Sequence, residues 1–227
     1  MMGQAILTGL FIYPVKGCRG IALNSVAVEP RGLANDRRYV IVDANDAFIS
    51  QRSHPVLATI DVALDDDGLH LSRADGDALT VPPLAGAARR PVRVWKDDVD
   101  ALDCGDAAAA WLSETVGEPC RLAQMDARAV RPVAPAFARP DDEVSFADGF
   151  PLLLTNTASL QALNAELSDP VPMARFRPNI VVEGFGPWEE DDAASFKIGG
   201  LAFRAPKTCA RCLVITTDQR TGERLGP

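Results

Sequence analysis

The segment TCARCLVITTDQRTGE, residues 208–223, carries the strongest local signal in the chain. Its pattern is C-x-R-C-x5-D-x2-T-G, with Cys209 and Cys212 as a close pair of thiols. An apolar, β-branched run follows the pair, and such residues favour strands. We therefore expect Leu213–Thr216 to form a strand that begins directly after Cys212.

A C-x-x-C pair alone is compatible with several roles. Structural zinc needs four ligands, and the remaining cysteines (Cys18, Cys104 and Cys120) are scattered along the chain. A thioredoxin-like pair should open a helix, whereas a strand is expected here. A plain pair of structural thiols also stays open. We favour a reactive or metal-binding thiolate, because Arg211 adjoins Cys212 and a neighbouring guanidinium favours the thiolate form. Thiolates suit soft, redox-active metals.

A second group of polar residues lies just upstream, in ARFRPN at 174–179. In an extended chain Arg175 and Arg177 share one face, and Asn179 adds an amide that donates and accepts. Two guanidiniums and an amide suit an anionic ligand rich in heteroatoms. The alternative is a pair of surface arginines that form ion pairs with acidic loops.

Near the start of the chain, YPVKGC (13–18) and DRRY (36–39) each place a cation at a turn or a strand entry. Lys16 and Arg37 can both face a phosphate from such positions, or can simply be solvated. The segment 128–140 holds Arg128, Arg131 and Arg139 with no acid. It predicts either a stiff solvated connector or a basic arm that helps to hold an anion.

Composition limits the function classes. The chain has 227 residues, 47% of them hydrophobic and 24% charged, which excludes disorder for most of it. A net charge of −8 argues against general nucleic-acid binding. No apolar run is long enough to cross a bilayer, and we interpret the apolar stretch Ala5–Tyr13 as a first strand and not as a signal peptide. The odd number of cysteines, five, favours a reducing compartment, so we expect a cytoplasmic protein without membrane contact.

Short strands separated by polar turns predict antiparallel hairpins and a barrel or sandwich in the first half. Two helices are also expected. One runs from Asp106, as its cap, to about Val116, with Gly117 as its stop. The other runs from about Ala158 to Leu167 with Asn156 or Thr157 as its cap, and we expect its buried stripe to consist of Leu160, Leu163 and Leu167.

Several segments together resemble one family. They are YPVKGCRG, NDRRYVIVD, the SQRSHP turn, FADGFPLLLTNTASLQALN, FRPNIVVEG and TCARCLVITTDQRTGE, in that order from about Leu7 to Glu223. They resemble the MOSC-domain proteins, named for the C-terminal domain of molybdenum cofactor sulfurase, and in particular the branch with an N-terminal β-barrel, such as the amidoxime-reducing components and their bacterial relatives.

The resemblance implies a molybdenum cofactor, with Cys212 as the metal ligand and catalytic residue. The cofactor-binding residues it implies are Lys16, Arg37, Arg177, Asn179 and Arg211. Ala210 and Gly17 stand where some members have serine, which removes two hydroxyl contacts. Pyridoxal phosphate is not expected, and the chain lacks a cysteine set for an iron–sulfur cluster.

The implied fold is α+β and β-rich, with an N-terminal MOSC β-barrel domain at 1–120 and a MOSC domain at 121–227. Family members continue past the T-G turn, so the chain looks truncated at Pro227. The implied function is a molybdenum-dependent oxidoreductase that reduces N-hydroxylated or N-oxide compounds with electrons from a separate ferredoxin, flavoprotein or cytochrome. The alternative is a cofactor-binding or sulfur-carrier module without turnover of its own.

Overall fold

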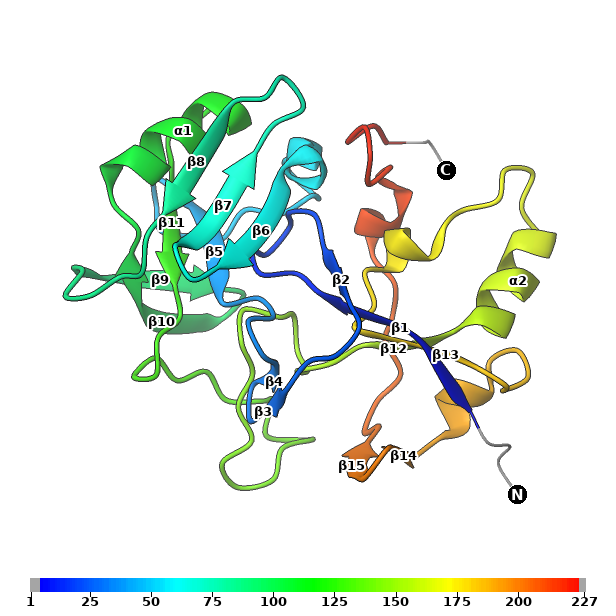
Figure 1. Ribbon diagram of the computed structural model, residues 1–227. Helices are drawn as coiled ribbons and strands as arrows, with labels where there is room; N and C mark the ends of the chain where they lie inside the picture. Colours follow the sequence, from blue (N-terminus) through cyan, green and yellow to red (C-terminus); the bar gives the residue numbers. More distant parts are fainter. Residues whose placement is uncertain (1–4, 225–227) are drawn as a thin grey trace.

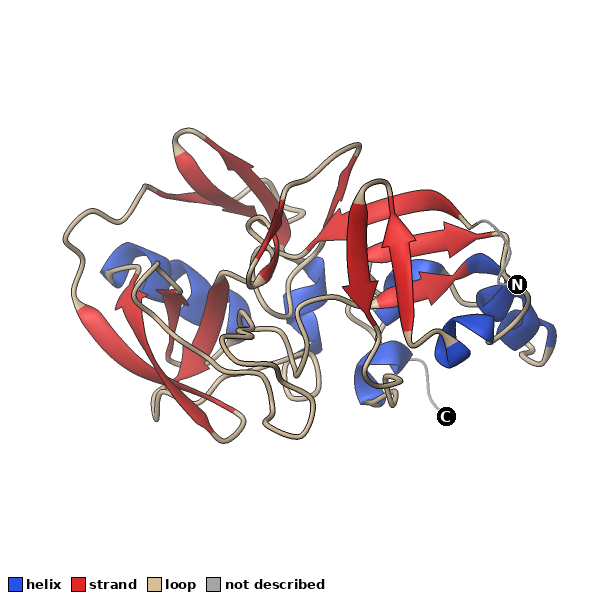
Figure 2. Ribbon diagram, turned by 90° about the horizontal axis from the view of Figure 1, so that it is seen from below, coloured by secondary structure: helices blue, strands red, loops and turns tan. Residues whose placement is uncertain are grey.

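The computed structural model describes residues 5–224 and is rich in β-structure, with two α-helices, as the sequence predicts (Figure 1). The apparent end of the chain at Pro227 lies outside the described residues. Seen from below, two groups of strands lie side by side and are joined by long loops (Figure 2). No helix among residues 5–224 has the length and apolar character needed to span a membrane.

Two sheets and one helix are formed by the part of the chain from Tyr39 to Gln124. A four-stranded sheet has the order β5-β11-β10-β9, formed by Tyr39–Asp43, Cys120–Gln124, Asp97–Asp103 and Arg89–Val94. A three-stranded sheet has the order β6-β7-β8, formed by Asp61–Asp65, Gly68–Ser72 and Ala78–Val81. The helix α1 (Asp106–Val116) packs on β11. A short 3₁₀ helix, η1 (Pro55–Thr59), precedes β6.

The helix α1 buries one apolar face, formed by Ala108, Trp111 and Leu112. These side chains join a core that includes Leu57 and Leu122. The left-handed Gly117 ends the helix as expected. The predicted cap is wrong: Asp106 is the first helical residue, and Gly105 occupies the cap position with φ 89°, a conformation that favours glycine.

A second four-stranded sheet joins the N-terminal segment to strands from the second half of the chain. Its order is β12-β13-β1-β2, formed by Leu154–Asn156, Ile180–Glu183, Ile6–Ile12 and Ile21–Leu23. The first strand pairs antiparallel with β13, so the apolar N-terminal stretch is a strand as predicted. The division of the chain at residue 120 stays a prediction, and this sheet includes strands from both sides of it.

The helix α2 (Thr157–Ala165) lies on the outer side of this sheet (Figure 1). Asn156 is its cap, as expected, and its side chain accepts a hydrogen bond from Ala158 N. The predicted buried stripe is only partly correct. Leu160 and Leu163 are half-buried and line a cleft, and Leu167 is 39% exposed because the helix ends before it.

The C-terminal third has less regular structure than expected. Its hairpin β14-β15 (Ser195–Ile198 and Leu201–Arg204) lies near the base of the molecule in Figure 1, as does the hairpin β3-β4 (Val28–Glu29 and Gly32–Leu33) from the N-terminal part of the chain. Two single 3₁₀ turns, η2 (Met173–Phe176) and η3 (Glu189–Asp192), flank β13 in the chain. The strand predicted at 213–216 is wrong: Leu213–Thr216 form the 3₁₀ turn η4, and residues 205–212 are irregular.

Candidate functional site

All six predicted site residues line one cleft of about 1080 Å³. They are Lys16, Arg37, Arg177, Asn179, Arg211 and Cys212. The cleft is large enough for a cofactor-sized ligand. Nine Lys or Arg residues and six Asp or Glu residues line it, whereas the whole chain carries a net charge of −8. The cleft is therefore a local region of positive charge in an acidic protein.

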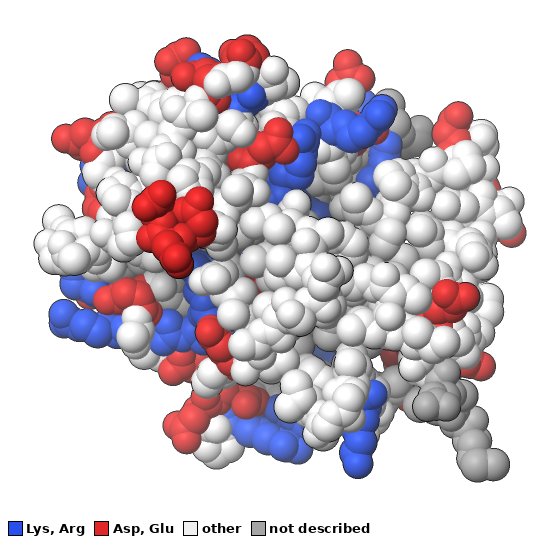
Figure 3. Space-filling model, in the orientation of Figure 1, with Lys and Arg blue, Asp and Glu red and all other residues white. Residues whose placement is uncertain are grey.

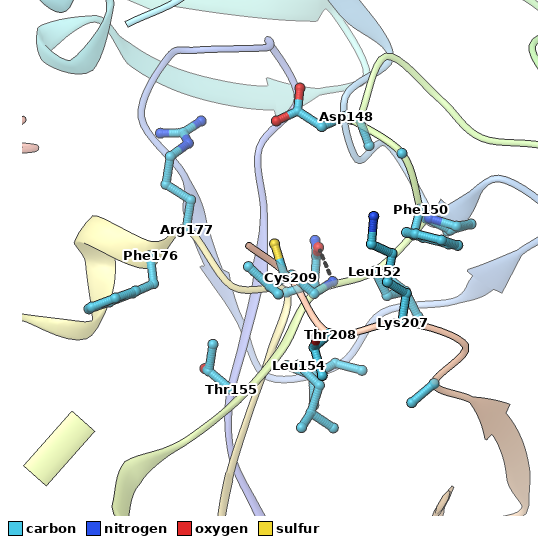
Figure 4. Close-up of a pocket in the computed structure, with 18 of the residues that line it drawn as sticks. Asp148, Phe150, Leu152, Leu154, Thr155, Phe176, Arg177, Lys207, Thr208 and Cys209 are labelled. Carbon is cyan, nitrogen blue, oxygen red and sulfur yellow. Dashed lines mark hydrogen bonds between the residues drawn. The ribbon is translucent and has the colours of Figure 1, made fainter. Parts of the chain in front are cut away.

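The basic residues come together from segments that are distant in sequence. In Figure 4, Arg177, Asp148 and Cys209 lie around one hollow, on three different segments of the chain. On the face drawn in Figure 3, Lys and Arg form several groups, one near the top and others at the lower left and along the bottom. Much of the right half of that face carries no charge.

Lys16 is buried between the two halves. Its ammonium group donates to the Phe146 carbonyl at 2.8 Å and to Asp148 Oδ1 at 2.6 Å, and it lies 5.1 Å from the centre of the Phe48 ring. Burial lowers the pKa of Lys16 to about 8, although Asp148 opposes the shift. An ammonium group has three N–H donors, so one remains for a ligand.

Asp148 completes this pair at the edge of the cleft. Burial alone would raise its pKa, but the charge and hydrogen bond of Lys16, the Trp95 indole N–H at 3.2 Å and the charge of Arg52 hold the pKa below its usual range. Its side chain is 62% exposed. Asp148 is therefore a carboxylate at neutral pH and moderates the positive charge of Lys16.

Arg37 and Arg177 stack on the ring of Tyr13. The guanidinium carbons lie 4.4 Å and 4.3 Å from the ring centre. Both arginines have left-handed backbone angles, φ 48° and 52°, which non-glycine residues adopt at a cost of roughly 1–3 kcal/mol. Arg37 also forms an ion pair with the buried Asp36 at 2.6 Å. This arrangement fixes two cations at the cleft wall at the expense of local strain.

Asn179 is 1% exposed, and its amide is engaged by the protein. Its Oδ1 accepts from Leu153 N at 3.1 Å and from Arg37 Nη1 at 2.9 Å, and its Nδ2 donates to the Phe11 carbonyl at 3.1 Å. The side chain therefore positions Arg37 and joins β1 to the entry of β12. One Nδ2 proton stays free for a ligand.

Arg175 is the second arginine of the ARFRPN segment. Because η2 is a 3₁₀ turn and not an extended strand, the expectation that Arg175 and Arg177 share an extended face is wrong. Arg175 is 6% exposed, and its Nε has no hydrogen-bond partner in the described part of the chain. Its nearest carboxylate oxygen, on Asp218, is 3.6 Å away. Its Nη1 donates to the Ile215 and Thr216 carbonyls at 3.5 Å and 3.4 Å, so only the Nε donor of this buried guanidinium is open to an anionic ligand.

The two thiols of the C-x-x-C pair have different neighbours. Cys209 and Cys212 are both exposed and lie in irregular chain. Arg52 Nη1 lies 3.7 Å from Cys212 Sγ. Cys209 Sγ contacts only the Ala210 carbonyl, at 3.7 Å, among the contacts of the described residues. A cation therefore faces Cys212.

The cation beside Cys212 is not the one predicted. Arg211 donates to the Phe176 carbonyl at 2.9 Å and lies 5.1 Å from that ring, so it braces the turn that carries Phe176. The guanidinium that contacts the Cys212 thiol is that of Arg52, which is held 4.4 Å from the Trp95 ring centre. The sequence offered one signal for Arg52: it lies in the SQRSHP turn.

The contacts of Arg131 bear on whether the segment 128–140 is a solvated connector or a basic arm. It is 3% exposed and forms an ion pair with Asp97 at 2.9 Å. Its guanidinium also donates to the carbonyls of Ser145, Ala147 and Asp148. The segment is therefore not simply a solvated connector, because Arg131 holds the loop whose Phe146 carbonyl and Asp148 carboxylate anchor Lys16.

The chemistry of the cleft fits an anionic cofactor with a soft metal. Buried cations supply charge-assisted hydrogen bonds for phosphate, and an exposed thiol beside a guanidinium supplies a soft ligand. No cluster of three or more His, Cys, Asp or Glu that could hold a metal ion by protein ligands alone occurs within residues 5–224.

Comparisons with known proteins agree with this description. The MOSC N-terminal beta barrel domain matches residues 4–119, and the MOSC domain matches residues 141–226. Mitochondrial amidoxime-reducing component 1 is 33% identical in Mus musculus and 32% identical in Homo sapiens, over 94% of this chain and 66% of each relative. Molybdenum cofactor sulfurase of Danio rerio is 31% identical over 96% of this chain and 29% of the relative.

The chain thus spans slightly less than two thirds of the amidoxime-reducing components and under a third of the sulfurase. Both kinds of relative align with nearly all of it, and the two domain matches together account for most of its residues. The chain belongs to the MOSC-domain family, in the branch that carries an N-terminal MOSC β-barrel domain.

Proposed function

We propose that the cleft binds a molybdenum cofactor and that the protein is a molybdenum-dependent oxidoreductase acting on N-hydroxylated or N-oxide compounds. The observation that carries this proposal is the convergence of Lys16, Arg37, Arg177 and Cys212 on one positively charged cleft. The relatives named amidoxime-reducing components support the reaction class.

Each residue of the cleft would have a role that follows from the chemistry of its side chain. Cys212 would be the protein ligand of the metal, with the Arg52 guanidinium beside its sulfur. Lys16 and Arg177 would hold the anionic groups of the cofactor, and Arg211 would contribute from the cleft rim. Asn179 would act mainly by holding Arg37 in place.

The cofactor, when bound, would supply the two-electron chemistry that removes oxygen from nitrogen. The electrons would come from a separate donor protein of the ferredoxin, flavoprotein or cytochrome type. The substrate would be a small molecule that enters the same cleft. A cytoplasmic location remains part of this proposal.

The similarity to molybdenum cofactor sulfurase favours one alternative. In that case the chain would hold the cofactor, or carry sulfur on Cys212, without turnover of its own. Turnover of an N-hydroxylated amidine with a chemical electron donor separates the two functions.

The test uses protein purified from cells that synthesise molybdenum cofactor. We expect molybdenum bound to the chain, a fluorescent pterin after oxidation, and turnover of the amidine. Cys212→Ser should abolish turnover, because a neutral hydroxyl replaces a soft anionic ligand. Cys209→Ser is the matched control and should retain metal and activity.

Three results would contradict the proposal in different ways. One zinc ion per chain with no molybdenum would refute the cofactor. Molybdenum without turnover would favour the carrier alternative. Loss of activity in Cys209→Ser with retention in Cys212→Ser would reverse the ligand assignment.

A further inference from the structure

Two glutamine side chains lie next to Arg177 and form a closed pair. Gln51 Nε2 donates to Gln219 Oε1 at 3.0 Å, and Gln219 Nε2 donates back to Gln51 Oε1 at 2.8 Å. We propose that this amide pair is a neutral positioning device, which directs the Arg177 guanidinium into the cleft without cancelling its charge. This inference rests on the proposed function, since it concerns how the cleft holds an anionic cofactor.

The pair is fully engaged in hydrogen bonds. Gln51 is 1% exposed, and its Nε2 also donates to the Gly17 carbonyl at 2.6 Å. Gln219 Nε2 donates also to the Thr217 carbonyl at 3.2 Å, and Gln219 Oε1 accepts from Arg177 Nη1 at 3.0 Å. A network without unsatisfied atoms has a well-defined geometry, so the orientation of the guanidinium is defined as well.

The pair connects three segments that carry proposed cofactor contacts. Gly17 follows Lys16 directly, Arg177 ends the turn η2, and Gln219 lies a short distance past η4 and Cys212. Gln51 and Gln219 are separated by 168 positions in the sequence. Their contact therefore sets the relative positions of an N-terminal cation, a central cation and the C-terminal thiol.

The neutrality of the amides is the second part of the argument. Arg37 forms an ion pair with Asp36, and Lys16 forms one with Asp148, each at 2.6 Å. Arg177 has no ion pair with an Asp or Glu among residues 5–224; its hydrogen-bond acceptor is the oxygen of an amide. Burial lowers its pKa to about 10, so the guanidinium is still charged at neutral pH. Its charge thus remains available to a ligand.

Two substitutions of Gln219 break the pair with and without a change of charge. Gln219→Glu keeps an acceptor for Arg177, but its carboxylate neutralises the guanidinium and cannot donate to Gln51 Oε1 or the Thr217 carbonyl. Gln219→Met keeps the site neutral but removes the acceptor. Gln161→Glu, on the exposed side of α2, makes the same chemical change away from the cleft and is the matched control.

The main readout is the rate at which purified protein loses molybdenum and pterin during dialysis. Groups that orient metal-site residues commonly contribute about 10-fold to 100-fold in affinity. We expect Gln219→Glu and Gln219→Met to lose the cofactor at least about 10-fold faster than the wild type. Gln161→Glu should match the wild type. Thermal unfolding of each variant verifies that the fold is retained.

A second readout needs no cofactor. Pyrophosphate binding to metal-free protein, measured by titration calorimetry, should weaken in both Gln219 variants and stay unchanged in Gln161→Glu. If Gln219→Glu does not fold, Gln51→Met takes its place, because it removes the support of Gln219 and leaves the acceptor of Arg177.

The outcomes are distinct from those of the proposed function. Wild-type protein without molybdenum would refute the cofactor, while the pyrophosphate measurement would still decide the role of the pair. Wild-type rates of cofactor loss and wild-type pyrophosphate affinity in either folded Gln219 variant would overturn the inference, even if the wild type carries the cofactor.

Discussion

The structure predicts that Arg131→Met lowers the free energy of unfolding. It removes the ion pair with Asp97 and three donations to the carbonyls of Ser145, Ala147 and Asp148. Removing one partner of a buried pair usually costs about 3–5 kcal/mol, because the other partner is left uncompensated. Asp97 is 24% exposed and keeps some solvation, so we expect a loss of about 3 kcal/mol.

For a chain of this length, 1 kcal/mol corresponds to a change in Tm of about 2–4 °C. Arg131→Met should therefore lower the Tm by about 6–12 °C in differential scanning calorimetry. Arg128→Met is the control, because Arg128 is exposed in the same segment; surface substitutions of this kind stay within about 0.5 kcal/mol. A loss below about 1 kcal/mol in Arg131→Met, or equal losses in both variants, would show that the loop does not depend on this guanidinium.

Three further predictions follow from single residues. Because burial lowers the pKa of Lys16 to about 8, pyrophosphate affinity should fall between about pH 7 and 9, and Lys16→Arg should remove most of that dependence; calorimetric titrations at several pH values test this. The pKa of Lys16 is about 8 in the folded chain and has its ordinary value of 10.5 in the unfolded chain, so the contribution of Lys16 to the free energy of unfolding rises between about pH 8 and pH 10.5. Gly68→Ala should lower the free energy of unfolding in urea by more than about 1 kcal/mol, since residue 68 has φ 127° and a Cβ there would lie 2.1 Å from the Val81 carbonyl oxygen. Gly76→Ala should cost less, because a Cβ at residue 76, with φ 91°, would have no atom within 4 Å. Asn156→Ala should cost about 1–2 kcal/mol, because it removes the cap of α2 and a donation to the Gly186 carbonyl, and equal urea midpoints for variant and wild type would contradict it.

The sequence predicted which residues lie along the cleft better than it predicted which side chains contact one another there. The resemblance to the MOSC family pointed to Lys16, Arg37, Arg177 and Cys212, and the structure places all four along one cleft. The helix α1 was predictable because its apolar spacing and its terminal glycine are local signals. Local patterns report what the backbone favours within a few residues.

The contacts that the sequence did not predict connect distant segments. Arg52 and Cys212 are 160 positions apart, and the burial of Arg131 depends on carbonyls that lie 14 to 17 positions further along the chain. The run at 213–216 favours a strand by composition, yet forms the turn η4, because its carbonyls face Arg175 instead of a partner strand. Strand propensity depends strongly on such tertiary context.

The pairing of β1 with β13 has a consequence for synthesis of the chain. Thr8 and Val181 are 173 positions apart, and ribosomes add about 5–20 residues per second. The first strand therefore waits roughly ten to thirty seconds for its partner, paired meanwhile with at most the three residues of β2. An unpaired strand edge can associate with other chains. A nascent or prematurely ended polypeptide that lacks Ile180–Glu183 would keep this edge open, so we expect chaperone contact with the N-terminal strand to persist until the last third of translation.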